Sequence, residues 1–186
     1  MSENVDLSAA ERRMKGAMES LRREFASIRT GRATPSILDG VEVEAYGSRM
    51  PLNTVANISA PEARLLTVTP FDPGTSKDIE RAIENADLGL NPQNDGKIIR
   101  LPIPELTEER RKEMIKRARG MAEDARVSVR NVRRDELKDI SELRKEGEIS
   151  EDEERRADEE MQKLTNRYVS RIDESLSDKE SELSEV

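Results

Sequence analysis

Residues 107–134, TEERRKEMIKRARGMAEDARVSVRNVRR, determine the fold that we expect for the whole chain. Apolar residues recur there every three or four positions, which predicts one long amphipathic helix. Its buried seam comprises Ile115, Ala118, Ala122, Ala125, Val129 and Val132. The stretch holds ten Lys and Arg against five Asp and Glu, a local charge of +5, whereas the whole chain carries −8. A basic stripe on one helix of an otherwise acidic protein is the main clue to function in this sequence.

The helical spacing extends well beyond this stretch. It continues through Leu137, Ile140 and Leu143, which predicts a helix of roughly 40 residues and about 60 Å. Residues 6–29 and 150–176 show the same spacing and predict two further helices. Three helices with one apolar face each are expected to bury those faces together in a bundle.

The sequence also suggests where these helices begin and end. Ser8 with Glu11, and Ser150 with Glu153, have the spacing of a capping box at a helix start. Residues 177–186 are mostly polar and are expected to fray.

The middle of the chain has a different pattern. Residues 31–104 contain all eight prolines and several short alternating segments, including 41–46, 65–68 and 98–101. One helix is expected over residues 76–86. We therefore predict an α+β protein in which a three-helix bundle, residues 1–30 and 105–186, is interrupted by a small β/α/β domain, residues 31–104. The two connections form a candidate hinge of Thr30, Gly31, Arg32, Pro102, Ile103, Pro104 and Glu105.

The composition excludes many kinds of site. The chain of 186 residues has no Cys and no His, which removes most zinc, haem and iron–sulfur sites, thiol catalysis and the Ser-His-Asp triad. The acidic cluster at residues 151–154 is interpreted as a helix start with a solvated face. We expect no catalytic residues, no cofactor and no metal. No segment is apolar enough to span a membrane and the N-terminus lacks the apolar part of a signal peptide, so a cytoplasmic protein is expected.

Arginines dominate the basic stripe. Arg119, Arg126, Arg130 and Arg133 are separated by seven, four and three residues, which places them along one side of the helix. A guanidinium group fits phosphate because it donates two parallel hydrogen bonds and stays charged, so eight Arg against two Lys in residues 107–134 favour a phosphate partner. The alternative is a solvated face paired with the acidic third helix. Further candidates near this side or at the end of the first helix are Arg110, Arg111, Arg134, Arg29 and Arg32.

Five segments, in order, resemble the ribosome recycling factors of bacteria and organelles. They are IRTGRA at 28–33 followed by PS at 35–36, LGLNP at 88–92, LTEERRK at 106–112, VRNVRRD at 129–135 and ISED at 149–152. The resemblance covers essentially the whole chain. It implies a three-helix bundle with an inserted β/α/β domain, in an L shape of roughly transfer RNA dimensions.

The resemblance also implies a function. With elongation factor G and GTP hydrolysis by that partner, such a factor splits the post-termination ribosome into subunits. The bundle is expected to lie on large-subunit ribosomal RNA near the inter-subunit bridge, with the small domain facing elongation factor G and the factor acting as a monomer. Arg130 and Arg133 are the first candidates for RNA contacts, followed by Arg111 and Arg32. The alternative hypothesis is a helical-bundle adaptor that binds only protein.

Overall fold

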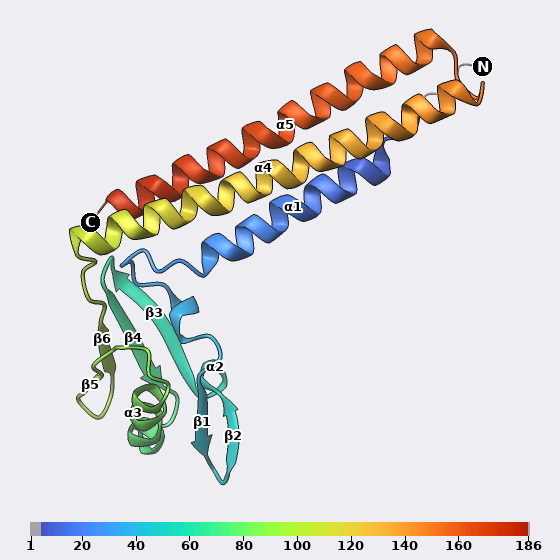
Figure 1. Cartoon of the computed structure of the whole chain (residues 1–186). Coiled ribbons are helices and arrows are strands. Elements are labelled where there is room, and N and C mark those ends of the chain that lie inside the picture. The colour runs from blue at the N-terminus through green and yellow to red at the C-terminus, as the bar shows by residue number, and fades with distance from the viewer. Residues whose placement is uncertain (1–4, 186) are drawn as a thin grey trace. The chain divides into compact units, whose positions relative to one another are not determined.

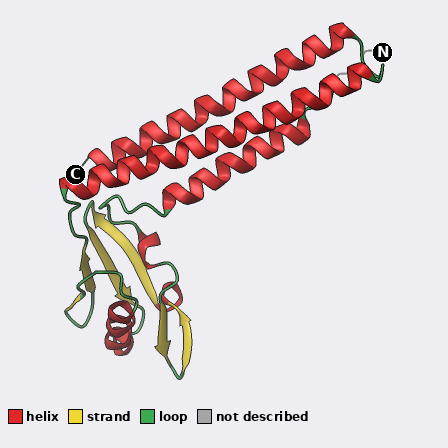
Figure 2. Cartoon of the chain, viewed as in Figure 1, coloured by secondary structure: helices red, strands yellow, loops and turns green. Residues whose placement is uncertain are grey.

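The computed structural model describes residues 5–185 and divides them into two compact units (Figure 1). One unit takes in the chain up to Arg29 together with Thr107–Glu185, and the other comprises Thr30–Leu106. The first and last residues of the predicted bundle, 1–4 and 186, lie outside the described residues. One unit is helical and the other combines strands with short helices (Figure 2), so the predicted α+β class is confirmed.

The helical unit consists of three helices that lie side by side (Figure 1): α1 (Ser8–Ala26), α4 (Glu108–Lys145) and α5 (Glu151–Ser184). The 38 residues of α4 correspond to about 57 Å at the usual helical rise. The predicted seam of α4 is buried from Ala118 to Val132, and Met114 takes the position at its start, where Ile115 is only half-buried.

Two predictions about helix ends differ from the structure. Ser8 does not cap α1, because its own backbone N–H donates to the Asp6 carboxylate at 2.9 Å and Leu7 occupies the capping position. Fraying after residue 176 is also wrong, because α5 continues to Ser184 and Leu183 is fully buried. Leu183 lies seven residues after Leu176, so the apolar seam extends for two further turns. The capping box of Ser150 and Glu153 is confirmed.

The small unit contains two antiparallel sheets. A hairpin joins β1 (Glu42–Ala45) to β2 (Ser48–Pro51), and a four-stranded sheet has the order β3-β4-β6-β5. Its strands are β3 (Ala56–Glu62), β4 (Leu65–Pro70), β5 (Gln93–Asn94) and β6 (Ile99–Pro102). The helical segments of this unit are η1 (Pro35–Leu38), α2 (Leu52–Val55), η2 (Pro73–Thr75) and α3 (Ser76–Asn85). The short elements η1, α2, η2 and β5 have no counterpart among the predicted elements.

The small unit has its own apolar core. Alternate residues of β4 and β6, among them Leu66, Val68, Ile99 and Leu101, are completely buried. They pack in one cluster with Val43 of β1 and with Ile79 and Ile83 of α3. Because this core is complete within residues 30–106, the small unit is a compact body of its own.

Candidate nucleic-acid interface

Four arginines line the side of α4 that adjoins α5, and we call Arg119, Arg126, Arg130 and Arg133 the α4 row. Three of them reach partners on α5, because Arg119 contacts Glu180, Arg126 contacts Asp173 and Arg133 contacts Gln162. Arg119, Arg126 and Arg133 therefore lie where α4 packs against α5, and Arg130 bonds within its own helix.

The first half of the row is neutralised by carboxylates. Arg119 forms an ion pair with Glu180, which raises the pKa of the guanidinium. Arg126 donates to Asp173 through Nε at 2.8 Å and to Glu123 through Nη1 at 3.0 Å, and its side chain is only 18% exposed. This half matches the alternative expected from the sequence, a bundle face paired with the acidic third helix.

In the second half of the row, carboxylates compensate less of the positive charge. Arg130 is half exposed and donates to Glu123 at 2.9 Å, a carboxylate that it shares with Arg126. Arg133 donates to the side-chain oxygen of Gln162 at 3.1 Å, and this partner carries no charge. Arg134 is exposed and forms no ion pair with any of the described residues. Three arginines within five positions of α4 thus offer guanidinium groups that a phosphate can engage.

The other arginines proposed for the interface lie elsewhere. Arg110 and Arg111 are in the first turn of α4, about 35 Å along the helix from Arg133. Arg110 is exposed and pairs with Glu113 at 2.8 Å, and Arg111 is half-buried. Arg29 belongs to the helical unit and Arg32 to the small unit, and both are exposed.

Most of the candidate hinge residues lie in the two irregular segments that connect the units. Thr30, Gly31 and Arg32 precede η1, and Pro104 and Glu105 follow β6. Gly31 has a φ of +76°, and a Cβ built on it would lie 3.4 Å from Cγ of Leu106, so the two segments are adjacent within the small unit. The left-handed φ explains why glycine stands at this position.

Two of the hinge candidates are tied to the four-stranded sheet, one as a strand residue and one by a backbone hydrogen bond beside it. Pro102 is the last residue of β6, and the N–H of Ile103 donates to the carbonyl of Arg64 at 2.9 Å. Arg64 in turn forms an ion pair with Glu105. Pro102, Ile103 and Glu105 are therefore held by contacts with the small unit.

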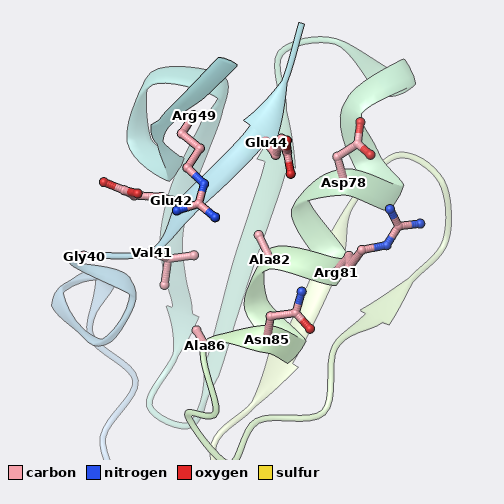
Figure 3. Close-up of a pocket in the computed structure, with 10 residues that line it drawn as sticks. All are labelled: Gly40, Val41, Glu42, Glu44, Arg49, Asp78, Arg81, Ala82, Asn85 and Ala86. Carbon is pink, nitrogen blue, oxygen red and sulfur yellow. The ribbon is translucent and has the colours of Figure 1, made fainter. Parts of the chain in front are cut away.

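A polar groove of about 400 Å³ crosses the small unit between the β1–β2 hairpin and α3 (Figure 3). Its charged side chains are of both signs, with Glu42, Glu44 and Asp78 beside Arg49 and Arg81. Gly40, Val41, Ala82, Asn85 and Ala86 complete the lining. This mixture does not favour one charge of ligand, and the groove contains none of the predicted site residues.

The described residues offer neither a cluster of metal ligands nor a membrane-spanning helix. Within residues 5–185 no group of three or more Asp or Glu side chains is arranged to hold a metal ion. None of the helices in that range combines the length and the apolar character needed to cross a membrane.

The carboxylate and amide side chains that the α4 row contacts could not be identified from the sequence. Glu180, Asp173 and Gln162 lie 61, 47 and 29 residues along the chain from the arginines that they contact. No local pattern links such positions, although Glu123 lies within the same helix at a spacing that faces both Arg126 and Arg130.

Comparisons with known proteins identify the family. A family model described as ribosome recycling factor matches residues 21–183. The ribosome-recycling factor of Rubrobacter xylanophilus is 69% identical over 186 residues, covering 100% of both chains, and that of Bacillus licheniformis is 53% identical over 180 residues, covering 97% of both.

Solved structures agree with the sequence comparisons. A solution structure of the ribosome recycling factor has a TM-score of 0.73 at 42% identity, covering 95% of this chain and 94% of the other. A second has a TM-score of 0.61 at 42% identity, covers 95% of both chains, and is described as the T. thermophilus factor in models with E. coli elongation factor G on the E. coli post-termination complex. The resemblance seen in the sequence is confirmed, and the chain belongs to the ribosome recycling factor family.

Proposed function

We propose that this chain acts with elongation factor G and GTP to separate the post-termination ribosome into subunits, and that its bundle binds large-subunit ribosomal RNA through α4. As a member of its family the chain is a translation factor and not an enzyme. A relative of 42% identity is described together with elongation factor G on a post-termination complex, and this supports both partners. Because its proposed target is the ribosome, we expect the chain to work in the cytoplasm. We also expect it to act as a monomer.

The RNA interface is proposed because carboxylates compensate the charge of three arginines near the middle of α4 only in part. Arg133 bonds a neutral amide, Arg134 has no ion pair among the described residues, and Arg130 shares one carboxylate with Arg126. Each guanidinium donates in the plane of a fork that matches two phosphate oxygens. Contacts of this kind bind the RNA backbone without reading its sequence.

The rest of the bundle supplies rigidity. Ala118 and Ala122 are completely buried and Ala125 nearly so, which allows the neighbouring helices to approach α4 closely. We propose that this rigid bundle transmits force from the small domain to the contact between the ribosomal subunits. The irregular connections near residues 30–32 and 104–106 are then the places where we expect the chain to bend, with the ion pair between Arg64 and Glu105 to be broken or carried along in that motion.

The arginines of the first half of the row are weaker candidates within this proposal. Arg119 and Arg126 already have carboxylate partners on α5, and a phosphate would have to displace them. Arg110, Arg111, Arg29 and Arg32 remain proposed contacts at other places on the chain, the last two beside the proposed hinge.

The test is subunit splitting of purified post-termination ribosomes, followed by light scattering with and without elongation factor G and GTP. We expect splitting only when the chain, the partner and GTP are all present. Absence of splitting, together with no co-sedimentation with ribosomes at low salt, would refute the proposal and favour a protein-binding adaptor.

A further inference from the structure

Glu123 is an acidic residue that contacts two members of the α4 row. Its Oε2 accepts a hydrogen bond from Arg126 at 3.0 Å and its Oε1 accepts one from Arg130 at 2.9 Å. These bonds, that from Arg130 first, lower the pKa of Glu123 below its usual value, so the group is a carboxylate at neutral pH. Each carboxylate oxygen is therefore occupied by one guanidinium.

The two arginines depend on Glu123 to different degrees. Arg126 has a second carboxylate, since Nη2 lies 2.7 Å from Asp173, and its side chain is 18% exposed. Arg130 is 48% exposed, and among the described residues Glu123 is the carboxylate with which it pairs. The charge of Glu123 thus acts mainly on Arg130.

The contact also determines where the Arg130 side chain lies. Its partner is seven residues earlier, two turns toward the start of α4, so the guanidinium is held along the helix. To bind a phosphate, Arg130 must exchange one anion for another. An ion pair at the surface is weak enough for this exchange to occur, and a phosphate placed nearby is repelled by the carboxylate that it displaces.

We propose that Glu123 is a positioning residue that acts through Arg130: its carboxylate competes with an RNA phosphate for the guanidinium, which lowers the affinity of α4 for ribosomal RNA and speeds release. This inference rests on the proposed function, because it assumes that Arg130 contacts RNA. A factor that must leave the ribosome after each round of recycling benefits from a competing group of this kind. Most changes in affinity within one interface are changes in the dissociation rate.

The variant that tests the proposal is Glu123→Gln, which removes the charge and keeps the size of the side chain. Its matched control is Glu142→Gln, on the same helix, with the same change in net charge. The Glu142 side chain is 54% exposed, against 52% for Glu123, and it lies 4.0 Å from Lys138, which is outside the α4 row. Both substitutions are at exposed positions, and circular dichroism verifies that both variants fold.

The measurement is the affinity for purified ribosomes and the rate of dissociation from them, at several salt concentrations. We expect Glu123→Gln to bind up to about fivefold more tightly at low salt, mainly through slower dissociation, with a smaller gain as salt increases. Glu142→Gln changes the affinity much less. In an Arg130→Ala background the gain from Glu123→Gln is largely lost, since the two residues act through one contact.

Three results would overturn the inference, and they separate it from the proposed function. If Arg130→Ala weakens binding but Glu123→Gln behaves like Glu142→Gln, the RNA interface stands and the role of Glu123 is wrong. If the gain persists at full size without Arg130, Glu123 acts by another route. If Arg130→Ala leaves binding and its salt dependence unchanged, the proposed contact at Arg130 is wrong and the inference is overturned with it.

Discussion

Replacement of Ala122 by Leu tests whether the helices pack closely enough for the bundle to transmit force as a rigid body. Ala122 lies in the middle of the α4 seam and is 0% exposed. Leu adds three carbon atoms to the side chain at this position. If unfilled space were present, burying them would stabilise the bundle by about 0.8 kcal/mol per carbon, or about 2.4 kcal/mol. If no space is present, the helices must move apart, which typically costs about 1–3 kcal/mol.

We expect the second outcome, because Ala118, Ala122 and Ala125 are consecutive positions of one buried seam and together keep the helices close. The matched control is Ala9→Leu on α1, the same chemical change at an exposed position. Its expected effect is within about 0.5 kcal/mol, since Leu is nearly as good a helix former as Ala.

The assay is urea unfolding of both variants followed by far-ultraviolet circular dichroism, which reports mainly on the three long helices. The prediction is a lower transition midpoint for Ala122→Leu and an unchanged midpoint for Ala9→Leu. A stability of Ala122→Leu equal to or above that of the parent chain would refute the close packing, and with it the argument that the bundle is rigid because of its small seam residues.

Three further predictions concern individual positions. Ser150→Ala removes the capping box of α5 and is expected to cost about 0.5–2 kcal/mol in urea unfolding; no change would mean that the cap contributes nothing. The N–H of Ile98 and the guanidinium of Arg100 lower the pKa of Asp95 below its ordinary 3.8, so its stabilisation is present above about pH 4 and lost as the pH falls further. Asp95→Asn should therefore be less stable than the parent chain at pH 7 and approach it in acid, and an equal difference at both pH values would contradict this. Gly31→Ala forces a left-handed φ of +76° on a residue with a Cβ and should destabilise the small unit by about 1–2 kcal/mol, measured by hydrogen exchange of β4 amides; unchanged protection would show that the backbone can relax.

The helical part of the fold was predictable because its signal is local. Apolar residues three and four apart in α4 become the buried seam almost without exception, from Ala118 to Val132. The fraying predicted after residue 176 was wrong because Leu183 is the single apolar residue of positions 177–185, and its burial depends on the other helices of the bundle. The two-residue strand β5 is likewise formed by pairing with β6 and has no periodicity of its own.

The candidate site was predictable only in part for the same reason. The spacing of the α4 row indicated one side of a helix, and Arg119, Arg126 and Arg133 do share the side that faces α5. The sequence could not tell which arginines would be neutralised, because Asp173 and Glu180 are far away along the chain. The packing of α5 against α4 therefore determines that Arg119 and Arg126 pair with carboxylates of α5, whereas the other arginines of the row remain available to a phosphate.

The salt dependence of ribosome binding tests the central claim most directly. The affinities of the parent chain, Arg130→Ala, Arg133→Ala and Arg119→Ala would be measured over a range of salt concentrations. Each lost phosphate contact should reduce the slope of log affinity against log salt by about 1, so we predict this loss for Arg130 and Arg133. Arg119, already paired with Glu180, should show a smaller change. Slopes for Arg130→Ala and Arg133→Ala equal to that of the parent chain would contradict an RNA interface on α4.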